Sequence, residues 1–575
     1  MKKGEDLTVR NPALAVIAPD RISDHWRYDG TKGFLAAERI STPEVGLSHP
    51  SLSFEVAPDL SIVTGGQLTL FGHPFRLDGR VARNFRTADL GISGIVSIDS
   101  LLEHPLVPPE AREPVLHFGK GLFLRAEAEI DFARPIPEQV RFSAESTDPI
   151  SLAGFDALRA GARGTFYPAD ADLSVSRLSV DTPDFHLQCR YDHNFETNQF
   201  RFLVNGDFHP SAIDGWMRPW WREMWEDFEI PNPAWIDLDL SGDWDYRDDR
   251  FLFGGIAFED IHLRGTPIQK GHARMWSRPY FFELFDLRAY RPEGEASGSF
   301  ANLMNWENRE TFAYLYDFDS NFHLKAISPL FGEPVREIVQ RFDAPEAPAI
   351  MIRGTILPEE DGRGDLLERL MIRAESDDPL RFNGILLDTL TLEALYSNDA
   401  VTVEPIRFGL GDGTGGASVR WSRLVPESLS MKIDYEGGDP AAFVDAIPRL
   451  SEELADRFPE KRKNKNDKTR NLNFSIECTG DPSDPETLLG EGALDLRTPN
   501  LANVRLLGVL SRISEELPLP LTLGSFEFQR AKTEFLLNRG LVEFTDFHLY
   551  SPTSRVVATG SYSMETEEID FDGKM

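Results

Sequence analysis

The C-terminal residues 540–575 carry the feature that most limits how this chain can fold. Apolar and polar side chains alternate there over three short runs, and two turn segments, one containing Pro552 and the other Glu565, separate the runs. Alternation with a period of two, interrupted by turn residues, is typical of an antiparallel β-meander. This stretch therefore predicts consecutive strands that share one apolar face.

The same unit recurs elsewhere in the chain. In residues 178–206, Pro183 precedes Glu196 by thirteen residues, which is also the separation of the proline and the glutamate in the C-terminal stretch. Looser copies lie at residues 401–435 and 280–327, where Gly-rich turns replace the proline turn. Repeats of this kind indicate an array of similar modules, each of which packs mainly on its neighbours.

A proline step and a short amphipathic segment follow three of these copies. The steps at His209, Ser328 and Asp439 are 119 and 111 residues apart. Behind each step, apolar residues recur at helical spacing, a second proline suits the first helical turn, and a third proline ends the segment. The three predicted helices are residues 219–228, 334–342 and 448–458.

We therefore predict a mainly β fold. It is an elongated array of antiparallel β-meander modules that forms a curled sheet or groove, with short amphipathic helices between the modules. The predicted domains are 1–33, an N-terminal segment; 34–160, a degenerate first β module; 161–242, with helix 219–228; 243–354, with helix 334–342; 355–480, with helix 448–458 and a basic loop at 459–470; and 481–575, the C-terminal β module.

The last 85 residues contain a further set of short motifs. They are a strand at 493–496, an apolar helix at 504–514, a Phe-rich hairpin at 524–528, D-x-x-L-x-S-P at 546–552 and A-x-G-S-Y at 558–562. With these motifs, residues 491–575 resemble the AsmA-like C-terminal domain, and most of the remaining chain resembles the family through its repeats. The resemblance implies a repeating β-groove, bridge-like lipid-transfer protein of double-membrane bacteria that works in the periplasm and is associated with the inner membrane.

The ends of the chain differ from that family, whose members usually begin with an inner-membrane helix. Residues 1–33 contain no apolar core of a signal peptide, and no apolar span of 18 residues occurs anywhere in the sequence. We therefore expect either a fragment or start-site variant of a longer protein, or delivery by a partner. In the copy at residues 178–206, Pro210 of the proline step follows Pro183 by 27 residues; the same distance from Pro552 ends beyond residue 575, which also predicts a truncated C-terminus.

Charge limits the class of partner. Ninety-four acidic residues against 60 basic residues give a net charge of −34. This balance excludes nucleic acid as an expected partner, because phosphate binding needs a basic surface. The one strongly basic run, residues 459–470, includes Lys461, Arg462, Lys463 and Lys465. It is either a solvated loop or a contact for anionic head groups or a protein partner.

Catalytic and metal-binding motifs are missing from the sequence. The twelve histidines form no H-x-x-H or H-E-x-x-H pattern, and no G-x-S-x-G motif is present. The Gly-rich residues 411–416 lack the lysine of a phosphate loop and are followed by a strand pattern, so they predict a β-turn. The Trp-rich residues 216–225 have the phase of a helix that covers a sheet. We expect no cofactor, no metal and no enzymatic activity.

Two cysteines, Cys189 and Cys478, are too few for a disulfide framework. Both lie in strand patterns of different modules. We predict two unpaired core thiols, with a bridge between distant modules as the alternative.

Two functions from different classes remain open. A long antiparallel sheet needs its apolar face covered, and the short helices cover only part of it, so the first hypothesis is a groove that shields the acyl chains of phospholipids or other lipids. Membrane or membrane-protein partners are expected with it. The alternative is a closed β-sandwich scaffold of the envelope without lipid; a carbohydrate-acting enzyme is a third, weaker hypothesis. The predicted lining residues are Phe526, Phe528, Phe535, Leu537, Phe544, Phe547, Phe200 and Phe202.

Overall fold

The structure is a computed structural model of the 575-residue chain. It describes residues 8–574 except for 18–29, 42–45, 98–120, 214–227, 305–310, 358–367, 423–428, 449–468, 502–527 and shorter gaps at 60, 71, 135, 153–154, 158, 183–184, 331–332, 482–483, 500, 553 and 567. The chain divides into two compact units. Unit 1 contains residues 1–263 and 270–282, and unit 2 contains residues 264–269 and 283–575.

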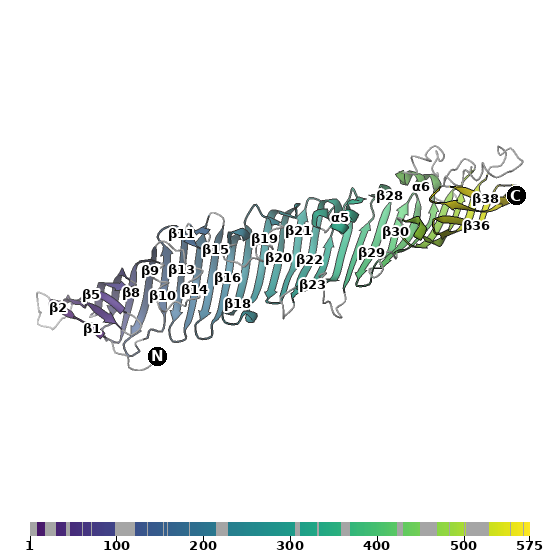
Figure 1. The fold of residues 1–575 in the computed structure, drawn as a ribbon. Helices are drawn as coiled ribbons and strands as arrows, with labels where there is room; N and C mark the ends of the chain where they lie inside the picture. The colour runs from purple at the N-terminus through teal and green to yellow at the C-terminus, as the bar shows by residue number, and fades with distance from the viewer. Residues whose placement is uncertain are drawn as a thin grey trace. The chain divides into compact units, whose positions relative to one another are not determined.

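Unit 1 is an antiparallel meander in which neighbouring strands mostly pair in chain order (Figure 1). The sheet begins with short paired strands that reach the long strand β5 through β3 and β4. The strands are β1(Thr8–Arg10), β2(Ala13–Ile17), β3(Lys32–Ala36), β4(Arg39–Ser41), β5(Gly46–Val56), β6(Ile62–Leu70), β7(His73–Val81), β8(Thr87–Ser97), β9(Gly121–Asp131), β10(Val140–Ser146), β13(Arg159–Tyr167), β14(Asp172–Asp181), β15(His186–Asn194), β16(Gln199–Phe208), β17(Phe228–Glu229), β18(Ala234–Asp243) and β19(Phe251–Leu263).

Short elements interrupt this meander at its connections. Strands β11(Ile150–Leu152) and β12(Phe155–Ala157) form a separate two-stranded ribbon between β10 and β13. The 3₁₀ helices η2(Pro210–Ile213) and η3(Arg247–Asp249) follow β16 and β18. The chain then passes from unit 1 to unit 2 within residues 264–282, which contain β20(Thr266–Arg278) and the start of β21(Phe281–Arg291).

Unit 2 continues with the same architecture. Its main sheet is again antiparallel, and its strands pair in chain order from β22 to β38 apart from the short strands of a separate small sheet. The strands are β22(Gly294–Met304), β23(Thr311–Ser320), β25(Ala349–Ile356), β26(Arg369–Ser376), β29(Thr389–Ser397), β30(Ala400–Leu410), β31(Gly413–Ser422), β32(Leu429–Gly438), β33(Asn471–Thr479), β34(Leu489–Arg497), β35(Arg530–Asn538), β36(Leu541–Tyr550), β37(Arg555–Ser563) and β38(Ile569–Lys574).

The helices α4(Leu324–Ile327), α5(Glu333–Gln340) and α6(Pro440–Ala446) and the small sheet of unit 2 follow strands that run in one direction. Helices α4 and α5, with η4(Ser328–Leu330) between them, come after β23, and α6 comes after β32. A small sheet of β24(Phe342–Asp343), β27(Leu380–Phe382) and β28(Ile385–Leu387) comes from the connections after β23 and β26, and η6(Pro485–Thr487) follows β33. Because β23, β26 and β32 are parallel to one another in this meander, α4, α5, α6 and the small sheet all start from the same sheet edge.

The predicted fold class is confirmed: the chain is mainly β, built as antiparallel meanders with few short helices. Helix α5 lies where the sequence predicts the helix at 334–342. Residues 219–227 of the helix predicted at 219–228 and most of the helix predicted at 448–458 lie outside the described residues. Phe228 begins strand β17, so the first helix does not extend to residue 228, and α6 ends two residues before residue 448. The predicted module boundaries stay predictions.

Candidate functional site

The residue register of unit 2 assigns its side chains to two faces of opposite character. Ile352 lies directly opposite Phe318 on one neighbouring strand and opposite Ile372 on the other. Side chains that are directly opposite in an antiparallel pair share a face, and successive residues point to opposite faces. One face of β22–β26 is therefore formed by Ala296, Gly298, Phe300, Asn302, Tyr314, Tyr316, Phe318, Ser320, Ile350, Ile352, Gly354, Ile356, Leu370, Ile372, Ala374 and Ser376.

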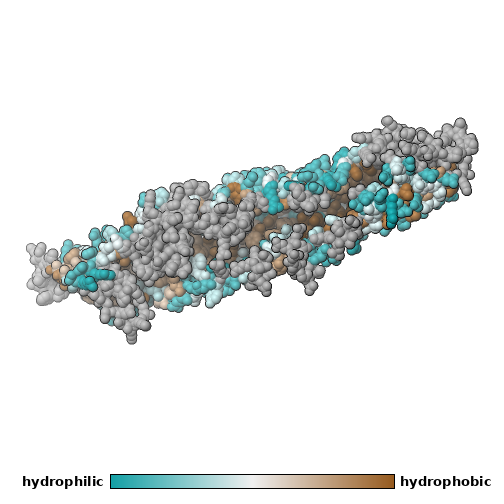
Figure 2. Space-filling view, in the orientation of Figure 1, coloured by the Kyte–Doolittle hydropathy of each residue, from teal (hydrophilic) through white to brown (hydrophobic). Residues whose placement is uncertain are grey.

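This face, which we call the unit 2 apolar face, carries no charged side chain at its register-paired positions in β22–β26. It extends through β29–β31 with residues such as Leu392, Ile406 and Val419. Most of its mid-strand side chains are half-buried, so the described residues leave part of their surface uncovered. Figure 2 shows the hydrophobic residues gathered in a hollow over these strands, between more hydrophilic margins.

The opposite face of the same strands carries the charged side chains, and several of them form ion pairs with one another. The Nε of Arg353 lies 2.9 Å from Oδ1 of Asp317, and its Nη2 lies 3.4 Å from Oδ2 of Asp319. Arg373 pairs with Glu375 at 3.2 Å. These groups are exposed, so each pair contributes at most about 1 kcal/mol to stability. Their effect is instead to keep this face in contact with water. The unit 2 apolar face is therefore the face whose exposure to water is unfavourable.

Unit 1 has an apolar face of the same construction. Phe200 and Phe202, two of the predicted lining residues, both lie on it; Phe202 is opposite Leu240 of β18 and Tyr191 of β15. The ring of Tyr191 stacks on Phe202 at a centroid distance of 4.3 Å, and Trp244 stacks on Phe200 at the same distance. Phe200 is buried beneath this stack, whereas Phe202 stays half-buried.

The C-terminal part of unit 2 differs, because its apolar face is largely closed. Predicted lining residues Phe528, Phe544 and Phe547 are only 5%, 6% and 1% exposed, and they belong to one hydrophobic core with Val444 of α6 and Leu501. Phe535 and Leu537 lie on the same face and are half-buried. Helix α6, Leu501 and Phe528 thus belong to a core on this face, whereas the described residues leave the face of β22–β26 partly uncovered.

A buried tyrosine holds this core to the sheet. Tyr435 of β32 is fully buried, and its hydroxyl donates a hydrogen bond of 2.5 Å to the carbonyl oxygen of Leu410. Its ring packs on Phe474 and Phe443, with centroids 5.2 and 5.3 Å away. A buried hydroxyl with a hydrogen-bond partner avoids the desolvation cost that an unpaired one would carry.

Several predicted residues cannot be placed. Phe526 and the basic residues Lys461, Arg462, Lys463 and Lys465 lie outside the described residues. The predicted contact of the basic run with anionic head groups or a partner therefore stays a prediction.

Both cysteines are free thiols, as the sequence predicts. Cys478 is buried on the apolar face of unit 2, opposite Met431. Cys189 lies on the apolar face of unit 1 but is half-buried, and its burial raises the pKa of the thiol to about 11. Neither thiol is set up as a nucleophile, because a reactive cysteine needs a lowered pKa.

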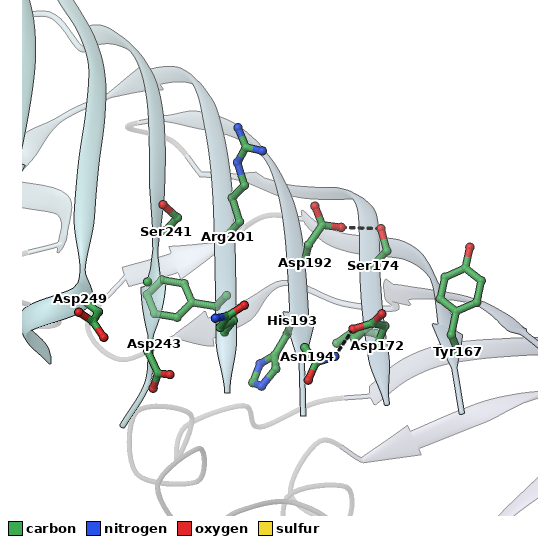
Figure 3. A pocket seen from close by; sticks show the side chains of 14 residues that line it. Tyr167, Asp172, Ser174, Asp192, His193, Asn194, Arg201, Ser241, Asp243 and Asp249 are labelled. Atoms are coloured by element: carbon green, nitrogen blue, oxygen red, sulfur yellow. Dashed lines mark hydrogen bonds between the residues drawn. The ribbon is translucent and has the colours of Figure 1, made fainter. Parts of the chain in front are cut away.

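A depression of about 660 Å³ with polar and apolar lining residues lies along β13–β18 of unit 1 (Figure 3). Both faces contribute to its lining: alternation places the side chains of Asp172, Asp192 and Asp243 on the polar face, whereas Phe200 lies on the apolar face. Ser174 donates to Asp192, and Asn194 donates to Asp172, each at 2.6 Å. These carboxylates are thus already engaged with neighbouring side chains.

The described residues contain no group of three or more His, Cys, Asp or Glu side chains that could hold a metal ion. Within the same residues, no helix has both the length and the apolar character that a membrane crossing requires. Comparison with known proteins adds no assignment: neither a family profile nor a curated protein sequence matches this chain.

Proposed function

We propose that this protein is a non-enzymatic, AsmA-like envelope protein that shields the acyl chains of phospholipids on the apolar faces of its sheets. The observation that carries the proposal is the uncharged, half-buried face of β22–β26 in unit 2. Soluble proteins rarely leave a large contiguous apolar surface uncovered unless something binds there. A hydrocarbon chain is the ligand whose chemistry such a surface matches.

The free energy gained when a hydrocarbon chain is buried on this face is sufficient for this role. Each methylene transferred from water to an apolar surface contributes about 0.8 kcal/mol, so ten methylenes contribute about 8 kcal/mol before the costs of association. The charged or zwitterionic head group has no counter-charge on the face of β22–β26, so it would remain in water at the margin of the hollow. We therefore propose selectivity for acyl chains over head groups.

The wider setting rests on the resemblance of residues 491–575. We propose transport of lipid between membranes, or outer-membrane biogenesis, in the periplasm, with association at the inner membrane through a membrane or membrane-protein partner. The acidic character of the chain, with a net charge of −34, supports a partner other than nucleic acid.

Native mass spectrometry with lipid extraction tests the proposal. The full chain, expressed in a double-membrane bacterium, is expected to carry phospholipid, and the double variant Ile352→Asp/Ile372→Asp is expected to lose it. The matched control is Met351→Asp/Met371→Asp, because these residues are directly adjacent on the same two strands but lie on the polar face. Equal lipid occupancy in both variants, or a wild-type protein without lipid, would contradict the proposal.

A scaffold without lipid is the second candidate, and the closed core of the C-terminal strands favours it. That core shows that parts of the apolar face are covered by the chain itself. If the purified protein shows only its own mass in detergent-free buffer, and apolar probes fail to bind it, the scaffold function replaces the lipid-shielding function.

A further inference from the structure

Three uncharged polar side chains lie together on the unit 2 apolar face, in addition to Ser320 and Ser376. They are Asn302 of β22 and Tyr314 and Tyr316 of β23, and we call them the polar cluster. All three are half-buried. Their neighbours on this face are Phe300, Phe318, Ile352 and Ile356.

The register brings the cluster together. Asn302 lies directly opposite Tyr314, and Phe300 lies directly opposite Tyr316. Directly opposite side chains have Cβ atoms roughly 4.5–5.5 Å apart, so Asn302 and Tyr314 are neighbours on one patch of surface. The Phe300 ring packs between the two tyrosines, with centroid distances of 6.0 Å to Tyr314 and 5.4 Å to Tyr316. The three aromatic rings thus form one packed group on the apolar face.

Part of the hydrogen-bonding capacity of the cluster is unused within the described residues. The side-chain oxygen of Asn302 is buried and makes no hydrogen bond there. A buried amide oxygen without a donor costs roughly 1–3 kcal/mol, which a bound donor would recover. Burial raises the pKa of Tyr316, and the nearby Tyr314 raises it further, so the Tyr316 hydroxyl stays protonated and able to donate.

We infer that the polar cluster binds the ester-linkage region of a diacyl glycerolipid, with the tyrosine hydroxyls donating to ester carbonyls and Asn302 accepting from a free glycerol hydroxyl where the lipid has one. This inference rests on the proposed function and narrows its ligand class. Phosphate and free carboxylate fit less well, because no cation lies at the register-paired positions of this face in β22–β26. The ester group is polar and uncharged, as the cluster is.

The test compares ester with ether lipids on the delipidated full chain. Dioleoyl phosphatidylcholine and its dialkyl ether analogue share chain length and head group, and they differ only in the carbonyls. Wild-type protein is expected to bind the diacyl lipid about fivefold to tenfold more tightly, because one net hydrogen bond corresponds to about that factor. Tyr314→Phe/Tyr316→Phe is expected to remove this preference while ether-lipid affinity is unchanged.

Two further variants sharpen the result. Tyr562→Phe removes a hydroxyl from the apolar face of β37, far along the same sheet, and is expected to keep the wild-type preference. Asn302→Leu is expected to weaken binding of diacylglycerol, which carries a free hydroxyl, about fivefold, and to leave phosphatidylcholine binding unchanged. Circular dichroism confirms that each variant is folded.

The outcomes separate this inference from the proposed function. Equal binding of ester and ether lipids by wild-type protein overturns the inference and leaves lipid shielding standing. No binding of either lipid overturns the proposed function itself. If a variant fails to fold, the ratio of the wild-type protein's affinities for the ester and ether lipids still tests the inference, because that measurement needs no substitution.

Discussion

Ile352 of β25 lies directly opposite Phe318 of β23, and both side chains belong to the face of unit 2 that carries no charge, whereas the adjacent pair Arg353 and Asp317 faces the other way. A single residue step along these strands therefore separates an ion-paired surface from an apolar one. This relationship lets a matched pair of adjacent positions test which face meets lipid.

A photo-crosslinking amino acid at Ile352 is expected to label co-purified lipid, and the same amino acid at Met351 is not. The reason is that Met351 is paired with Asp319 and Arg373 on the polar face, where no hydrocarbon would lie. Mass spectrometry of the irradiated protein measures the adducts. Labelling from Met351 that equals labelling from Ile352 would show that lipid contact is not confined to the apolar face.

Truncation of Phe547 tests the closed core of the C-terminal strands. Phe547 is 1% exposed, so Phe547→Ala is expected to lower the free energy of unfolding of this region by about 3–5 kcal/mol, from lost burial and the cavity left behind. Phe535→Ala is the control: it lies on the same face but is half-buried, and its loss is expected to be smaller. Denaturant unfolding followed by hydrogen exchange in β35–β37 measures both; equal losses would contradict a closed core.

The positions of the predicted lining residues show how far the sequence could predict the fold. Alternation predicted the strands and placed Phe200 with Phe202, and Phe535 with Leu537, on one face, as the register shows. Phe544 and Phe547 are three residues apart, so simple alternation would put them on opposite faces. They share a face because a β-bulge between them shifts the register. No residue in that stretch of the sequence indicates the bulge.

Other parts of the candidate site depend on contacts between residues distant in the sequence, which the alternation of apolar and polar residues cannot predict. Whether a residue on the apolar face is covered depends on connections distant in sequence, such as α6, whose Phe443 packs on Tyr435 and Phe474. The pairing of Asn302 with Tyr314 depends on the register between β22 and β23, which includes a shift near Met304. Sequence reasoning therefore missed the polar cluster, although two tyrosines separated by one residue in an apolar strand pattern were visible.

Gly438→Ala is expected to disrupt the core around Tyr435. A Cβ at Gly438 would lie 1.9 Å from the Tyr435 hydroxyl oxygen, and this buried ring has no space into which to move. Overpacking of this kind costs about 1–3 kcal/mol or more. Gly416→Ala is the control, because its nearest atom, the Ile406 carbonyl oxygen, would be 3.8 Å away. Thermal unfolding compares the two, and an unchanged midpoint for Gly438→Ala would contradict the packing described.

The reactivity of Cys189 reports on the environment of the unit 1 apolar face. With a thiol pKa of about 11, about one molecule in a thousand is thiolate at pH 8, against about a quarter for an ordinary exposed cysteine. In a Cys478→Ala background, alkylation of the delipidated native protein at pH 8 is therefore expected to be about two hundred times slower than in urea, and to rise about tenfold per pH unit up to about pH 11. Because the raised pKa comes from burial, bound lipid should slow the reaction further. Rapid alkylation at pH 8, with a pH profile centred near 8.5, would mean that water reaches this face freely and that it offers no apolar environment for an acyl chain.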